Sequence, residues 1–112
     1  MAVTVTDTGP RQTLRVAMHA TAGHVTKVTI PGRYRRFTVR LLQTDDATSD
    51  SGKLSWAGTD ATAVGDNFTP IASGDKEEFQ AYGGRARANG TYAVYLAAGT
   101  TSAYAHLDLY SE

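Results

Sequence analysis

The stretch RYRRFTVRLLQ, residues 33–43, decides the fold of this chain. Apolar side chains alternate in it with basic or polar ones: Phe37, Val39 and Leu41 against Arg36, Thr38 and Arg40. A period of two is typical of a β-strand with one buried face and one solvent-exposed face. We therefore predict a central strand here, with its apolar side toward the core and its arginines outside.

A second strand follows across the polar loop TDDATSDSG, residues 44–52. In the segment KLSWA, Leu54 and Trp56 alternate with small or polar residues. Trp56 is the only tryptophan of the chain, and so large an apolar side chain is a good centre for a core. We predict that this strand pairs with the central strand as a long-looped hairpin and that Trp56 is buried.

The rest of the chain shows the same alternation, interrupted by turn signals such as Gly9-Pro10, Pro31-Gly32 and Asn89-Gly90. The last two strands are expected to pair through residues 98–101. About eight strands at intervals of roughly ten residues indicate an all-β fold, an antiparallel β-sandwich of the jelly-roll kind. Further strands are predicted over residues 12–18, 25–30, 68–71, 76–82, 91–98 and 102–110. The predicted core comprises Val39, Leu41, Trp56, Phe79, Val94, Leu96 and Leu107.

The 112 residues suit one domain, which we place at residues 12–112. Residues 1–11 have only Val3 and Val5 to bury before the Gly9-Pro10 turn. They are interpreted as an N-terminal arm that becomes ordered on assembly, or as an edge strand. The sequence has no apolar run long enough to span a membrane and no secretory pattern at its start, so we expect a soluble protein with no membrane partner.

Several function classes lack their signatures. Cysteine is absent, which excludes disulfides and thiolate metal sites. No nucleophile elbow, phosphate loop or dinucleotide fingerprint occurs, so we expect no enzyme, no catalytic residues and no cofactor. His106 and Asp108 share a strand face, and the acidic loops at 44–50 and 58–67 offer oxygen ligands for calcium. Neither pattern supplies a complete ligand set, and we predict no metal site.

Charge is segregated along the chain although the net charge is zero. Residues 11–40 contain seven basic side chains and no acidic one, whereas residues 45–78 are mainly acidic. These charges can meet within one sandwich or between subunits. With a pI near 6.8 and little aromatic interleaving, the arginines do not indicate nucleic-acid binding.

Arginines and outward tyrosines are common anchors of protein interfaces, because the guanidinium binds carboxylates through two bonds and the ring buries a large area. Outward tyrosines can also stack on sugars, as in carbohydrate-binding modules. We predict that these arginines and tyrosines form a protein interface and do not bind sugar. The candidate partner interface consists of Arg33, Arg35, Arg36, Arg40, Tyr95 and Tyr104.

Five segments carry a family resemblance: RFTV at 36–39, LSWAGTD at 54–60, AVGDNF at 63–68, IASG at 71–74 and YAVYLA at 92–97. Together they resemble the small β-sandwich virion proteins of tailed bacteriophages. The resemblance implies a capsid decoration, or cement, protein that binds the major capsid protein and stabilises coat contacts. It also implies a place on the capsid surface of the virion, after a soluble stage in the host cytoplasm, and assembly as a homodimer or homotrimer.

Two alternatives to decoration stay open from the sequence. One is a carbohydrate-binding β-sandwich module, and the other is a small adaptor of a head or tail fibre. We expect decoration rather than an adaptor because no coiled coil follows the last predicted strand.

Overall fold

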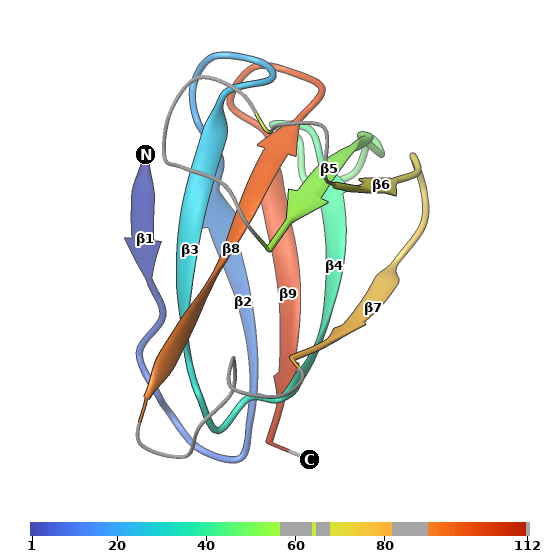
Figure 1. Cartoon of the computed structure of the whole chain (residues 1–112). Helices are drawn as coiled ribbons and strands as arrows, with labels where there is room; N and C mark the ends of the chain where they lie inside the picture. The colour runs from blue at the N-terminus through green and yellow to red at the C-terminus, as the bar shows by residue number, and fades with distance from the viewer. Residues whose placement is uncertain (57–63, 65–67, 82–89, 112) are drawn as a thin grey trace.

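The computed structural model describes residues 1–56, 64, 68–81 and 90–111. These residues form nine β-strands in two sheets that pack face to face (Figure 1). They include no helix and therefore none that could cross a membrane. The strands are β1 (Ala2–Thr4), β2 (Arg11–Ala17), β3 (Val25–Pro31), β4 (Arg36–Leu42), β5 (Gly52–Ser55), β6 (Thr69–Ile71), β7 (Glu77–Gln80), β8 (Thr91–Ala98) and β9 (Tyr104–Tyr110).

The two sheets have the strand order of a jelly roll. The five-stranded sheet has the order β1-β3-β8-β5-β6, and the four-stranded sheet has the order β2-β9-β4-β7. Every neighbouring pair is antiparallel except β1 with β3. Without β1, the eight remaining strands make two facing sheets of four, as in a double Greek key. The predicted fold class is thus confirmed.

Both predicted hairpins are wrong. Strand β4 lies in the four-stranded sheet and β5 in the five-stranded one. An isolated bridge between Leu42 and Ser49 pairs the end of β4 with the connecting loop, not with β5. Strands β8 and β9 are likewise in different sheets. A period of two identifies the side of a strand that faces the core, but both sheets of a sandwich satisfy it equally. Each loop crosses the end of the sandwich instead of turning back within one sheet.

The core lies between the sheets and contains six of the seven predicted residues. Trp56 is the exception, because it lies one residue beyond the end of β5 and is only half-buried at the rim. Its ring meets that of Phe37 edge-on, with centroids 5.9 Å apart. Phe68, at the start of the strand predicted over residues 68–71, is exposed and lies under the Lys53 ammonium group.

The N-terminal segment is paired within its own chain. Strand β1 runs parallel to β3, and the Val5 N–H donates to the Thr29 carbonyl oxygen at 2.8 Å. Val5 is buried and Val3 is half-buried against the core. In the structure this segment therefore has an intramolecular partner strand, whereas the arm interpretation assumed a partner from a neighbouring subunit.

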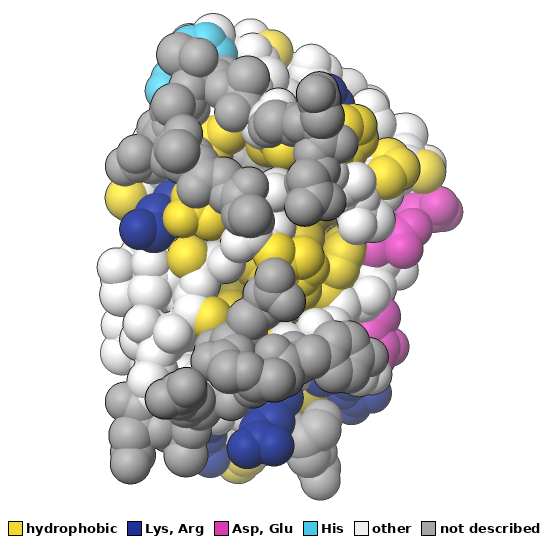
Figure 2. Space-filling model, in the orientation of Figure 1, with side chains coloured by type: hydrophobic (Ala, Val, Ile, Leu, Met, Phe, Trp, Pro, Cys, Tyr) yellow, Lys and Arg dark blue, Asp and Glu magenta, His cyan; other side chains and the backbone are white. Residues whose placement is uncertain are grey.

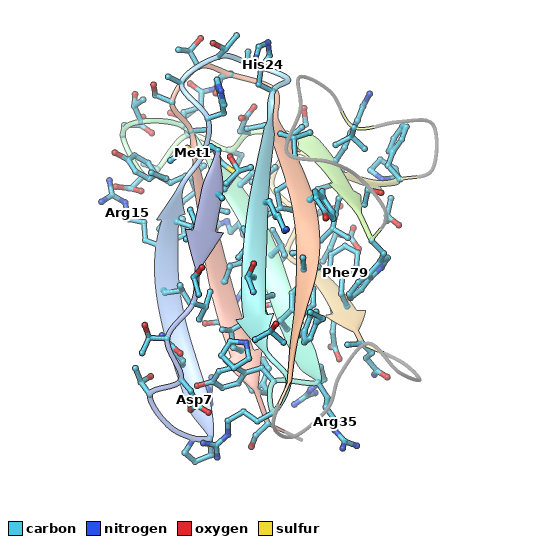
Figure 3. The ribbon with its side chains drawn as sticks, turned by 60° about the vertical axis from the view of Figure 1, so that its left-hand side comes forward. Met1, Asp7, Arg15, His24, Arg35 and Phe79 are labelled. Carbon is cyan, nitrogen blue, oxygen red and sulfur yellow. The ribbon has the colours of Figure 1, made fainter. Side chains whose placement is uncertain are left out.

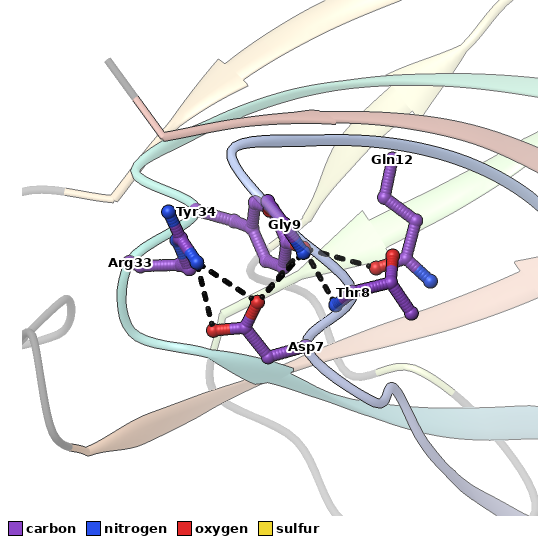
Figure 4. Close-up of polar contacts among 6 residues, drawn as sticks. All are labelled: Asp7, Thr8, Gly9, Gln12, Arg33 and Tyr34. Carbon is purple, nitrogen blue, oxygen red and sulfur yellow. Dashed lines mark hydrogen bonds and ion pairs between the residues drawn. The ribbon is translucent and has the colours of Figure 1, made fainter.

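A buried tyrosine that the alternation did not predict fastens this segment to one end of the sandwich (Figure 4). Tyr34 follows the turn after β3 and has no exposed surface. Its hydroxyl donates to the Gly9 carbonyl oxygen at 2.7 Å and accepts from the Thr8 N–H at 3.3 Å. The Asp7 carboxylate accepts from the Gly9 N–H and pairs with Arg33 at 3.1 Å. These bonds close the loop between β1 and β2 over the turn between β3 and β4.

Candidate interaction surface

The outward side chains of the four-stranded sheet form cross-strand rows, because β2, β9 and β4 are aligned residue by residue. We call this surface the arginine–tyrosine face. Its rows, each written from β2 through β9 to β4, are Arg11, Tyr110 and Arg36; Thr13, Asp108 and Thr38; Arg15, His106 and Arg40; and Ala17, Tyr104 and Leu42.

Guanidinium groups cover both tyrosine rings of this face. Tyr110 lies between two arginines, with the Cζ atom of Arg11 4.9 Å and that of Arg36 4.6 Å from the ring centroid. Arg15 stacks more closely on Tyr104, at 3.5 Å. Cations are attracted to the electron-rich face of an aromatic ring, and stacking restricts the rotamers of a long side chain. Three arginines are thus held flat against the sheet.

The loop between β4 and β5 supplies a carboxylate that fixes Arg15. Asp46 accepts from Arg15 at 3.0 Å and forms a 2.9 Å ion pair with its Nη2, while the Nε2 of His106 lies 3.0 Å away. Asp46 has a positive φ of 56°, which turns the loop back over the sheet. Desolvation opposes the shift, but hydrogen bonds from His106 and Arg15 lower the pKa of Asp46. The carboxylate is therefore ionised at neutral pH.

A second carboxylate lies in the middle of the face. Asp108 accepts from the Thr13 hydroxyl at 2.7 Å, from the Thr38 hydroxyl at 3.3 Å and from the Lys76 ammonium at 3.1 Å. The Thr13 hydrogen bond is the largest cause of its lowered pKa, and Lys76 adds to it. This row is therefore internally neutralised, and the uncompensated positive charge lies in the rows of arginines beside it.

The six predicted interface residues do not form one surface. Arg36, Arg40 and Tyr104 lie on the arginine–tyrosine face, as the alternation predicted. Arg33 and Arg35 belong to the turn between β3 and β4. Arg33 pairs with Asp7, and Figure 3 shows Arg35 at the same end of the molecule as Asp7. Tyr95 is on β8 and points out from the opposite sheet, in the same row as Lys27.

Arg36 and Arg40 differ in how they are held. An ion-pair contact of 3.6 Å joins Arg36 to Glu78 on β7, in addition to the stack on Tyr110. Arg40 is exposed, and over the described residues no carboxylate lies within ion-pair distance of it. Arg40 is therefore the cation of this face that is best placed to meet an acidic group of another molecule.

The pairing of β2 with β9 explains what the sequence did not predict. Tyr104 was correctly predicted to point outward, and the same alternation over residues 102–110 puts Tyr110 on that side, so the signal was present in the sequence. The contacts of these tyrosines with Arg15 and Arg11 depend on β2 being the neighbour of β9. The sequence predicted that β9 pairs with β8 instead. The stacks could therefore not be found until the strand order was known.

Two patterns in the sequence raised the question of a metal site, the pair His106 and Asp108 and the acidic loops at 44–50 and 58–67. Across the described residues, no group of three or more histidine and acidic side chains could hold an ion. In the first acidic loop, Asp45 accepts from the backbone and side chain of Thr48, and Asp46 is bound as described. The second acidic loop, apart from Val64, lies outside the described residues.

The opposite side of the molecule has a different character. Figure 2 shows apolar side chains gathered over the middle of the five-stranded sheet, among residues that are not described. Its outward basic side chains on the described strands are Lys27 and Lys53. A pocket of about 420 Å³ beside β5 and β8 is lined mainly by alanine and glycine, and Lys53 is the one titratable side chain among its described lining residues.

Comparisons with protein-family models, with curated proteins and with solved structures found no match to this chain.

Proposed function

We propose that this chain is a non-enzymatic structural protein of a bacteriophage virion, a capsid decoration protein. Its partner is the major capsid protein, and the contact surface is the arginine–tyrosine face. The observation that carries this proposal is the set of four arginines on one sheet face. Three of them stack on tyrosine rings, and the fourth, Arg40, is exposed with neither a ring stack nor an ion pair among the described residues.

Such a surface is suited to binding a protein. Arginine and tyrosine are the side chains that most often dominate interface energies. Because stacking already restricts three guanidiniums, less side-chain entropy is lost when they are covered by a partner. An open sheet face of outward-pointing side chains also fits the broad surface of a capsid shell better than it fits a small ligand, which needs a concave site.

The phage context comes from the sequence resemblance, and the fold is compatible with it. Jelly rolls occur in viral capsid proteins, but also in lectins and enzymes, so the fold alone does not decide between these roles. The sugar-binding alternative requires several exposed aromatic rings on one surface. Those of Tyr104 and Tyr110 carry arginine guanidiniums on their faces, and the outward Tyr95 lies on the opposite sheet. We therefore propose decoration alone.

The first prediction tests this surface with purified phage heads assembled without the chain. Added wild-type protein should sediment with the heads and raise the temperature at which they release DNA. The double variant Arg36→Ala, Arg40→Ala should bind at least about tenfold more weakly, since interface arginines commonly contribute about 1–2 kcal/mol each. Its binding should also depend less on salt, because fewer screened charges take part.

Lys27→Ala with Lys53→Ala is the matched control, because it removes two cations from the opposite sheet. This control should bind like the wild type. If heads bind none of the three proteins, the virion role is excluded. Equal binding of both double variants would move the contact away from the arginine–tyrosine face.

A further inference from the structure

Strand β2 has one long side without a partner. It forms one edge of the four-stranded sheet and pairs with β9 along all seven residues, and no other strand of the described residues pairs with it. The other edges are interrupted or short: β1 and β6 have three residues each, β6 includes Pro70, and β7 has four. Shortness and proline are common ways to prevent an edge from pairing with another molecule. Strand β2 has neither.

The hydrogen bonds at both ends of β2 show which of its backbone groups are unpaired. The Met18 N–H donates to the Ala103 carbonyl oxygen, and the Ser111 N–H donates to the Pro10 carbonyl oxygen, both at 2.9 Å. Even-numbered positions therefore point toward β9. Because backbone groups alternate in direction along an antiparallel strand, the odd-numbered positions point to the open edge. These are Arg11, Thr13, Arg15 and Ala17.

Charged side chains can also protect an edge, but the two arginines of β2 are directed elsewhere. Arg11 lies over the Tyr110 ring and Arg15 over the Tyr104 ring, both on the inner neighbour β9. Asp46 holds Arg15 in that position. The guanidiniums therefore stand above the sheet, and the row of unpaired N–H and C=O groups at the edge is not screened by them.

We infer that this edge pairs with the same edge of a second copy, antiparallel about a two-fold axis at Leu14. In this register Thr13 faces Arg15 of the other copy, Arg11 faces Ala17, and Leu14 faces its own counterpart. If the axis lay at Thr13, Arg11 of one copy would face Arg15 of the other. If it lay at Arg15, the two copies of Arg15 would face each other. Like charges directly across a strand pair are destabilising.

Several features make a second copy the fitting partner. The unpaired groups at the odd-numbered positions are complementary to themselves in an antiparallel arrangement. Leu14, half-buried at this edge, becomes covered by the other Leu14. The two four-stranded sheets merge into one, so both arginine–tyrosine faces lie on the same side of the dimer. The pairing is a property of the pure protein and does not rest on the proposed capsid role.

The experiment uses cysteine, which the chain lacks, so that one substitution introduces a single thiol. Across the proposed contact between the two copies, the two Leu14 residues form a non-hydrogen-bonded pair on the axis. The Cα atoms of such a pair are about 4.5 Å apart, within the range of a disulfide. Two copies of Thr13 are displaced along the strands in this register and lie beyond the limit of about 7 Å. Under mild oxidation, Leu14→Cys should form a covalent dimer at least about tenfold faster than Thr13→Cys.

Sedimentation and a proline variant complete the test. The wild-type protein should sediment as a dimer of the 11.9 kDa chain. Thr13→Pro removes an N–H that points to the open edge, so it should yield a folded monomer. The inference is overturned if the wild type is monomeric at every concentration, or if Thr13→Cys cross-links as fast as Leu14→Cys. If Thr13→Pro does not fold, the cysteine pair still decides.

Discussion

Tyr34 shows how one buried hydroxyl can secure the start of a chain. The ring is fully enclosed, and the hydroxyl reaches Gly9, Thr8 and Gln12. The backbone carbonyl of Tyr34 accepts a hydrogen bond from the Tyr92 hydroxyl, and burial raises the pKa of that hydroxyl. Buried polar groups are costly to leave unpaired, so each of these partners depends on the others.

We predict that Tyr34→Phe lowers the free energy of unfolding by about 1–3 kcal/mol, because the Gly9 carbonyl and the Thr8 N–H lose their partner at a partly buried contact. Urea denaturation measures this. Tyr104→Phe is the control, since it keeps the ring under Arg15 and removes a hydroxyl for which the structure gives no hydrogen bond among the described residues. An equal effect of the two substitutions would contradict the role assigned to the Tyr34 hydroxyl.

The sequence predicts side-chain direction well and single special positions poorly. Alternation correctly assigned the inward side of β4, β8 and β9, because one buried sheet face is enough to impose a period of two. Tyr34 and Trp56 lie outside strands, where no period applies, and their burial depends on segments distant in sequence. This is why Tyr34 was missed and Trp56 was placed too deep.

At the scale of elements, the same signal does not identify neighbours. The sequence predicted sequential hairpins, yet β5 and β6 are the one pair of consecutive strands, numbered along the described chain, that are hydrogen-bonded to each other. In a jelly roll the chain passes from one sheet to the other at the ends, and loop composition looks alike for both kinds of connection. The predicted interface therefore included Arg36 and Arg40 of β4 and Tyr104 of β9 but no residue of β2.

The N-terminal strand provides the prediction at this scale. Deleting residues 1–8 should lower the free energy of unfolding by roughly 2–4 kcal/mol, because the burial of Val5 is lost, with part of that of Val3, and the Tyr34 hydroxyl loses Thr8. The urea midpoint gives the measurement. Val5→Ala should cost more than Val3→Ala, since only Val5 is buried. A truncated chain with an unchanged midpoint would instead favour the free-arm interpretation.

For the whole molecule, folding brings together charges that are segregated in the sequence. Two arginines of the basic stretch pair with the acidic stretch, Arg15 with Asp46 and Arg36 with Glu78. A third, Arg33, pairs with Asp7 near the start of the chain. The sequence left open whether such charges meet within one sandwich or between subunits, and for these pairs they meet within it. Each exposed ion pair of this kind contributes little to the free energy of unfolding. The contribution of the paired aspartates is therefore best measured from how stability changes with pH.

Four aspartates have a lowered pKa in the folded chain, and they lie in different parts of the molecule. Hydrogen bonds from the Thr48 side chain and backbone lower the pKa of Asp45 to about 2. For Asp7 the main cause of the lowered pKa is the Gly9 N–H, and for Asp108 it is the Thr13 hydroxyl. Unfolded aspartates bind protons at a higher pH than these folded ones, so the unfolded state gains protons first as the pH falls.

The melting temperature should therefore be nearly constant above about pH 5 and should fall between about pH 4 and pH 2, as the folded carboxylates become protonated. Asp108→Asn should melt below the wild type at neutral pH, because it loses the charge that binds Lys76. The two melting temperatures should converge as the pH falls through the lowered pKa of Asp108, since protonation removes the same charge from the wild type. A difference that persisted unchanged at low pH would show that the amide of the Asp108→Asn variant disturbs packing and that the Asp108 charge does not stabilise the fold.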